Sequence, residues 1–309
     1  MNFYRERTFG ELISDTFNFF RQYGKNYFKN FLLLNGGVLI LLMLVIGIGF
    51  GDFISSIFQQ KGPEDVQFFA AYVSQGSPLF WLISLISMIL FILLGMIVYS
   101  FPALYLKRVS ENDVSGVSLN EMTTDLRNGL GKFLRFFLGL LFVLTPIFMI
   151  IFFFTGLLIM LIIGYILIIL ILPVMINIIN FTLMDMYHAE EGFFAALNEA
   201  FKIQFTKFWK YIGSTIVMYI IIQAVTTILV IIPMSIFGVR TFLSANQMQS
   251  TSPSFVIMVV VLYFFTIVLS LFLYNLIAIN AGLMYYDGRE DLHEKVALDE
   301  LDAIGKREE

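Results

Sequence analysis

The chain has 309 residues, of which 59% are hydrophobic and only 14% are charged, whereas a typical soluble domain carries about 25% charged residues. With a mean hydropathy of +0.85, this composition excludes a soluble globular enzyme, a disordered chain and a protein that binds nucleic acid through a basic surface. The chain has no cysteine, which excludes disulfides, thiol nucleophiles and cysteine-based metal sites. The composition therefore predicts an all-α, polytopic bundle of membrane helices, with no nucleic acid among its partners.

Charge-free stretches predict six transmembrane helices, because a charged side chain at the centre of a membrane helix costs about 2.5–3.5 kcal/mol. The spans are expected at residues 31–51, 79–106, 136–154, 157–184, 211–236 and 255–284. Each holds about the 20 apolar residues that a hydrocarbon core of about 30 Å requires. The uninterrupted apolar stretch 136–184 would be about 73 Å long as one helix, so it must turn. We expect the turn at Thr155-Gly156.

The distribution of basic residues predicts the orientation of these spans. With both termini on the same side, every one of the 19 basic residues except Lys61 and Arg240 falls on that side. Since Lys and Arg accumulate in cytoplasmic segments, both termini are expected to be cytoplasmic. Acids at Glu6, Glu11 and Asp15 interrupt the N-terminal stretch, so we do not expect a signal peptide there.

An amphipathic stretch precedes each odd-numbered span, and we expect it to lie in the cytoplasmic membrane interface as a helix. Apolar residues recur every three or four positions in each stretch: Phe9, Leu12, Ile13, Phe17 and Phe20; Leu119, Met122, Leu126, Leu130 and Phe133; Phe193, Leu197, Phe201, Phe205 and Phe208. The pattern divides a single membrane domain, residues 1–286, into three units of about 1–106, 107–184 and 185–286, followed by an acidic cytoplasmic tail at 287–309. Either duplication of one ancestral unit or convergence on the same physical requirement would explain this repeated pattern.

Five polar residues inside the predicted spans form the only candidate site within the membrane: Asn177 and Asn180 in span four, Asn275 and Asn280 in span six, and Tyr99 in span two. One interpretation is a polar cleft between the even-numbered helices that opens to the cytoplasm. The favoured interpretation is hydrogen bonding between helices, which contributes roughly 0.6–2 kcal/mol per contact. The predicted spans contain no Asp, Glu, Lys, Arg or His, which argues against proton-coupled transport.

Asp185, His188 and Glu191 are spaced three residues apart at the end of span four. On a continuous helix they would share one face and could offer ligands to a metal ion. The sequence has no established metal-binding signature and no nucleotide or hydrolase motif, so an ordinary polar junction is the favoured interpretation. We expect no catalytic residue, no metal and no cofactor.

Two short motifs resemble a known family. Glu191-Gly192-Phe193-Phe194-Ala195-Ala196-Leu197, followed by Phe208-Trp209-Lys210, and the ending Gly282-Leu283-Met284-Tyr285-Tyr286-Asp287-Gly288-Arg289 are similar to segments of the glycerophosphodiester phosphodiesterase membrane-domain group and its six-span relatives. The resemblance implies a bacterial cytoplasmic-membrane protein. It does not imply phosphodiesterase activity, because that activity belongs to a separate catalytic domain that this sequence lacks.

Three classes of function fit the sequence. The expected one is a non-enzymatic integral membrane protein, acting as a subunit or accessory factor in envelope assembly or membrane organisation. Its partners would be membrane lipids and other membrane-protein subunits. A small-solute or lipid-handling carrier that uses the polar cleft is the alternative, and an intramembrane enzyme is the least favoured class.

Overall fold

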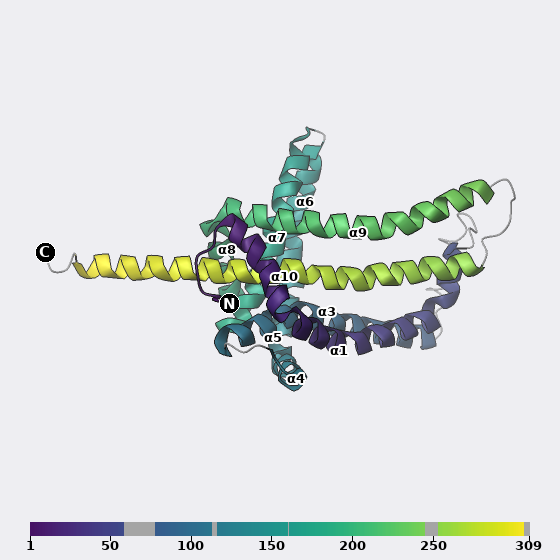
Figure 1. Ribbon diagram of the computed structural model, residues 1–309, viewed down its shortest axis with the longest axis horizontal. Coiled ribbons are helices and arrows are strands. Elements are labelled where there is room, and N and C mark those ends of the chain that lie inside the picture. The colour runs from purple at the N-terminus through teal and green to yellow at the C-terminus, as the bar shows by residue number, and fades with distance from the viewer. Residues whose placement is uncertain (59–77, 113–115, 160, 245–252, 306–309) are drawn as a thin grey trace. The chain divides into compact units, whose positions relative to one another are not determined.

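The computed structural model describes residues 1–58, 78–112, 116–159, 161–244 and 253–305, and the regular structure in these ranges is helical (Figure 1). Lys61 lies outside the described residues. In chain order the helices are α1 (Phe9–Phe58), α3 (Pro78–Asn112), α4 (Leu119–Asn128), α5 (Leu130–Gly139), the π-helical turn η1 (Leu140–Leu144), α6 (Thr145–Ile159), α7 (Ile163–His188), α8 (Phe193–Thr206), α9 (Phe208–Ser244) and α10 (Pro253–Gly305).

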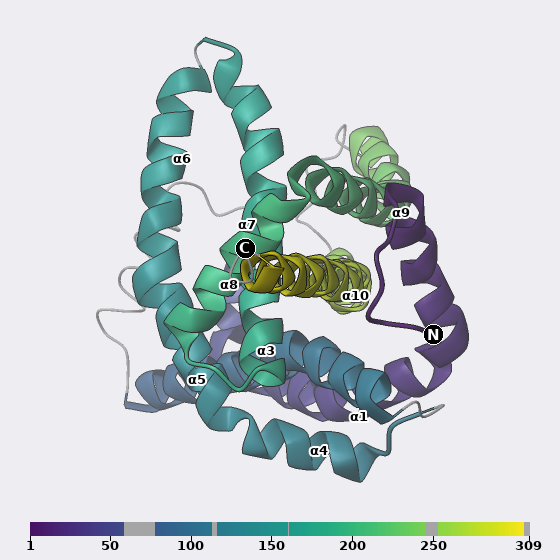
Figure 2. The same cartoon turned by 90° about the vertical axis from the view of Figure 1, so that its left-hand side faces the viewer.

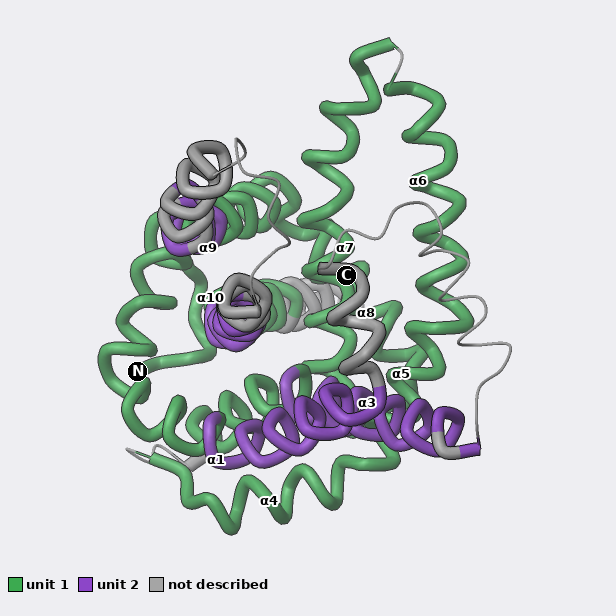
Figure 3. Tube along the Cα trace, turned by 90° about the vertical axis from the view of Figure 1, so that its right-hand side faces the viewer, with its two compact units in different colours: residues 1–31, 99–221, 274–309 green, residues 32–98, 222–273 purple. Residues whose placement is uncertain are grey.

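Six stretches of the described helices are long and apolar enough to cross a membrane, and each overlaps one of the six predicted spans. The prediction of an all-α, polytopic helical bundle is therefore confirmed. The chain forms two compact units (Figure 3). Unit 1 contains residues 1–31, 99–221 and 274–309, and unit 2 contains residues 32–98 and 222–273. Every one of the candidate polar residues lies in unit 1.

The prediction that the central stretch turns at Thr155-Gly156 is wrong, because both residues lie inside α6. The Thr155 hydroxyl donates a 2.7 Å hydrogen bond to the Ile151 carbonyl, and such bonding lets threonine continue a membrane helix. The chain turns instead around Ile162, which has a φ of 65°. A Cβ atom at Gly164 would collide with the backbone of Ile159, so this glycine permits α7 to pack beside α6 (Figure 2).

The three amphipathic stretches are helical, but they join their spans differently. The first is continuous with its span in α1. The second comprises α4, which begins at a capping box of Ser118 and Glu121, and α5, which continues through η1 into α6. The π-helical turn accompanies Pro146, which lacks the N–H that an α-helical turn would use. The third stretch is divided: most of it forms the separate helix α8, and its last residue, Phe208, begins α9.

Candidate functional site

The structure places the five candidate polar residues on three helices of unit 1: Asn177 and Asn180 on α7, Asn275 and Asn280 on α10, and Tyr99 on α3. The four amide side chains are buried, whereas Tyr99 is partly exposed. Each of the four amides contacts a hydroxyl group on a different helix.

The two amides of α10 bond to α1 and α9. The Tyr27 hydroxyl on α1 donates to Asn275 Oδ1. Ser214 Oγ on α9 donates to Asn280 Oδ1 over 3.0 Å, and Asn280 Nδ2 donates to Thr16 Oγ1 on α1 over 3.0 Å. Asn280 therefore connects three helices through one side chain.

The two amides of α7 bond to α9 and α10. Thr215 Oγ1 donates to Asn177 Oδ1 over 2.8 Å, and the Tyr274 hydroxyl donates to Asn180 Oδ1 over 3.2 Å. The Tyr99 and Tyr274 rings meet edge to face with centroids 5.1 Å apart. These contacts match the geometry of hydrogen bonds that hold membrane helices together. Asn177 Nδ2 has no hydrogen-bond partner among the described residues.

A second polar group, which we call the Asp287 cluster, consists of Asp287, Lys207, Lys210, Tyr211 and Arg7. The Asp287 side chain is fully buried. Its carboxylate accepts from the Arg7 backbone N–H at 2.6 Å, the Lys210 ammonium at 2.7 Å and the Tyr211 hydroxyl at 2.6 Å, and it lies 3.4 Å from Lys207 Nζ. A buried carboxylate is tolerated when it is paired and hydrogen-bonded in this way.

The N-terminal segment before α1 is fixed onto this cluster by Arg7. The Arg7 side chain is fully buried, and burial lowers its pKa, although a guanidinium remains charged at neutral pH. Arg7 Nε donates to Asp15 over 3.0 Å, and its two terminal nitrogens donate to the carbonyls of Phe3 and Asn2. The Lys210 ammonium also donates to the Arg7 carbonyl. The segment thus contributes both backbone and charge to the packing.

Lys207, which joins α8 to α9, keeps its charge in this setting. Burial by itself would lower the pKa of the Lys207 ammonium, but its hydrogen bond to Glu6 and the nearby charges of Asp287 and Asp291 raise the pKa above its ordinary value. The Lys207 ammonium lies 2.6 Å from Glu6 Oε1. The cluster therefore balances its buried charges among α9, α10 and the segment that precedes α1.

Asp185 and His188 face α10 and do not meet Glu191. The Tyr285 hydroxyl donates to Asp185 Oδ1 over 2.7 Å, and His188 Nε2 contacts the Tyr286 hydroxyl. Because α7 ends at His188, Glu191 lies beyond the helix and is exposed. No group of three potential metal ligands occurs among the described residues.

The sequence does not predict the Asp287 cluster, because the charge pattern places Asp287 in the acidic tail at 287–309. One residue in the sequence could have indicated close packing here: Gly288, which follows Asp287. A Cβ atom at Gly288 would come within 2.6 Å of Ile203 Cγ2 and 3.0 Å of the Tyr211 hydroxyl. Glycine therefore allows α10 to approach α8 and α9 closely, and α10 continues helically to Gly305.

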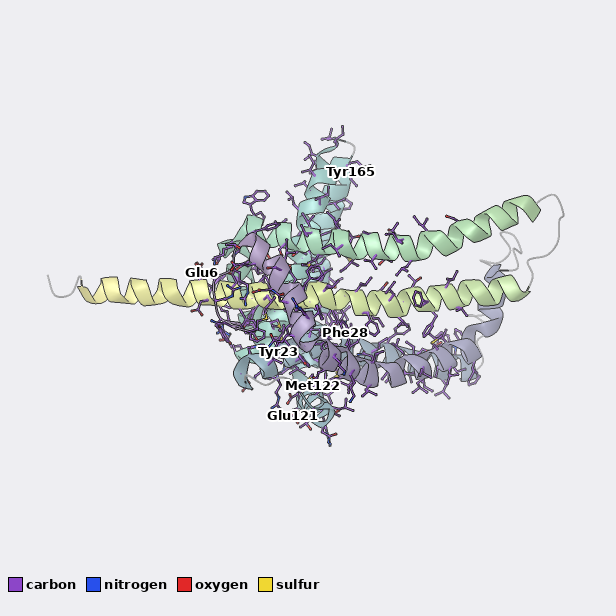
Figure 4. The ribbon with its side chains drawn as sticks, in the orientation of Figure 1. Glu6, Tyr23, Phe28, Glu121, Met122 and Tyr165 are labelled. Carbon is purple, nitrogen blue, oxygen red and sulfur yellow. The ribbon has the colours of Figure 1, made fainter. Side chains whose placement is uncertain are left out.

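The amphipathic stretches carry two apolar faces each. Their inner faces are buried in unit 1, as at Met122 on α4, Phe133 on α5 and Ile203 on α8. Their outer faces expose a second set of apolar side chains: Phe9 and Phe17 on α1, Leu130, Leu134 and Leu138 on α5, and Phe194, Phe201 and Phe205 on α8. Figure 4 labels Glu121 and Met122, neighbours on α4 that differ in burial, because Glu121 is exposed. Unit 1 does not bury these outer faces. Contiguous apolar surface of this kind is unfavourable in water and is typical of a contact with a membrane or a partner.

Comparisons with protein-family models, with curated proteins and with solved structures found no match to this chain.

Proposed function

We propose that this chain is a non-enzymatic integral protein of the bacterial cytoplasmic membrane that acts as a structural or accessory subunit in membrane organisation or envelope assembly. Six membrane-length helices support the membrane assignment. In the proposed orientation, both termini and the Asp287 cluster are cytoplasmic, which follows the distribution of Lys and Arg. The family resemblance at Gly282–Arg289 supports the bacterial assignment.

One observation carries the proposal for a structural role: the intramembrane amides bond to other helices. Asn275 and Asn280 contact hydroxyls on α1 and α9, and Asn180 contacts Tyr274 on α10. An amide whose acceptor oxygen is occupied by a neighbouring helix contributes to packing, and its capacity to bind a solute is reduced. The outer apolar faces of α5 and α8 add area suited to contact with lipid.

Paired substitutions test this role. Asn275→Leu alone leaves the Tyr27 hydroxyl buried without its acceptor, at a cost of about 1–3 kcal/mol. Asn275→Leu with Tyr27→Phe removes both ends of the bond and should be nearly neutral. We expect the double variant to complement a deletion strain and to melt in detergent close to the wild-type temperature. A folded double variant that fails to complement would overturn the structural role.

A specific observation favours the carrier as the second candidate. Asn177 Nδ2 and both polar atoms of the Gln204 side chain are buried without a hydrogen-bond partner among the described residues. Asn177 on α7 and Gln204 on α8 are each about 16 Å along the helix from the turn that joins α7 to α8. Under the carrier hypothesis, Asn177→Leu with Gln204→Leu abolishes solute or lipid movement without lowering the melting temperature.

A further inference from the structure

Some basic side chains of unit 1 point into the protein, and others point away from it. Arg7, Lys210 and Arg289 point into the protein, and each lies within ion-pair distance of a buried or half-buried carboxylate. Arg21, Lys25 and Lys29 on α1 are exposed and form no ion pair within the described ranges. These three cations therefore have no counter-charge in the part of the protein that the structure describes.

Arg21, Lys25 and Lys29 lie on one face of α1, because they are spaced four residues apart on a continuous helix. They cover about 12 Å along the helix axis. The opposite face holds Tyr23 and Tyr27, which are almost completely buried. Packing on that face fixes the rotation of the helix, so the cations cannot turn inward to find acidic partners. We call these three residues the α1 stripe.

Apolar side chains border the α1 stripe on the same face. Phe17, one turn before Arg21, is exposed. Beside the stripe, the Phe20 and Phe28 rings stack with centroids 5.3 Å apart, and Gly24 lies between them without a side chain to separate them. Figure 4 labels Phe28 on this part of α1. Cations that alternate with aromatic groups suit the level of lipid headgroups.

We propose that the α1 stripe binds the headgroups of anionic phospholipids in the leaflet that adjoins it. The proposal rests on the membrane placement given under the proposed function. Three unpaired cations match a net negative headgroup such as phosphatidylglycerol, and the choline of phosphatidylcholine would be repelled. Acyl chains would cover Phe17, whereas a soluble acidic partner would leave this side chain in water. The charge and the apolar borders together therefore select a lipid over an acidic peptide.

Competition between two lipids tests the proposal. The full chain, purified in mild detergent with an equimolar mixture of phosphatidylglycerol and phosphatidylcholine, is examined by native mass spectrometry for retained lipid. We expect the wild type to retain phosphatidylglycerol preferentially. The triple variant Arg21→Gln, Lys25→Gln and Lys29→Gln should lower the ratio of the two lipids by roughly tenfold, since each cation near an anionic surface contributes at most about fivefold.

A matched triple variant controls for net charge: Lys295→Gln, Lys306→Gln and Arg307→Gln, of which the last two lie outside the described residues. It should keep the wild-type ratio. Arg21→Lys should also keep it, because the charge is retained. An α1-stripe variant with an unchanged ratio, or a wild type without preference, would overturn the proposal. Displacement of the lipid by inorganic phosphate would overturn it too, because the stripe would then be a site for free anions.

Two further measurements separate the possible failures. If the triple variant does not fold, the salt dependence of the wild type decides: the preference should fall as ionic strength rises, and an insensitive preference contradicts the proposal. Extraction of membranes with alkaline carbonate tests membrane placement by itself. If alkaline carbonate extracts the chain, the proposed function is wrong. If the chain stays in the membrane but shows no preference for phosphatidylglycerol, only the proposed lipid site is wrong.

Discussion

A single carboxylate, Asp287, joins three segments that are far apart in the sequence: the residues before α1, the start of α9, and α10. Asp287→Asn keeps the shape of the side chain and removes its charge, which leaves Lys207 and Lys210 beside an uncharged amide. Breaking a buried pair costs about 3–5 kcal/mol, and the partial exposure of the two lysines places the expected loss near the lower end. The melting temperature in detergent measures this loss.

Glu199→Gln is the matched control for that prediction, because it makes the same chemical change in the exposed pair with Lys202. Exposed ion pairs contribute about 0–1 kcal/mol, so the melting temperature of this variant should stay near that of the wild type. Equal melting temperatures for Asp287→Asn and Glu199→Gln would show that the Asp287 cluster does not stabilise the fold.

At the scale of elements, the close contact of α10 with α8 predicts the effect of Gly288→Ala. The added Cβ would collide with Ile203, and overpacking of this kind costs about 1–3 kcal/mol. Gly131→Ala on α5 serves as the control, since no atom lies within 4 Å of its added Cβ, and replacing a helical glycine stabilises by about 0.5–1 kcal/mol. The two variants should therefore shift the melting temperature in opposite directions. A shift in the same direction for both would contradict the packing argument.

The outer face of α8 continues to the start of α9, where Trp209 is 71% exposed. The chain contains only two tryptophans, so Trp81→Phe leaves Trp209 as the sole source of tryptophan emission. If the α8–α9 junction lies in the membrane interface, Trp209 should emit at short wavelength in vesicles and be quenched by brominated lipids. Emission typical of water, with strong quenching by iodide, would place this junction away from lipid. Trp209→Phe, which leaves Trp81, provides the reference signal.

The sequence predicts the membrane helices where charged residues delimit them. Charged residues flank each span, and this determined the number and approximate position of the membrane helices. The position of the central turn was not predictable from Thr155-Gly156, because membrane helices accept both residues. The Asp287 cluster depends on Arg7, 280 residues earlier in the chain. No local sequence pattern indicates a contact between residues so far apart in the chain, so the contact is seen only in the folded structure.

At the scale of the whole molecule, the distribution of basic residues makes topology the decisive prediction. The chain lacks cysteine, so a single introduced cysteine reports one position. Ser14→Cys, at an exposed position of α1, should resist an impermeant maleimide applied to intact cells and react after permeabilisation. Ser250→Cys, which lies outside the described residues, should react in intact cells. Reaction of the Ser14 variant from outside would reverse the proposed orientation.

The unbroken course of α10 has a mechanical consequence. From Tyr274 to Gly305 the helix contains no break, and it carries Asn275, Asn280 and Asp287 on the same stiff rod. The backbone hydrogen bonds of a helix run along its axis and resist a change in its length. A force applied at one end of the helix is therefore transmitted along it. A load applied to the last turns of α10 would therefore strain the bonds to Tyr27, Ser214 and Lys210 together. Because the three contacts lie on one continuous helix, a displacement of α10 along its axis would move all of them at once.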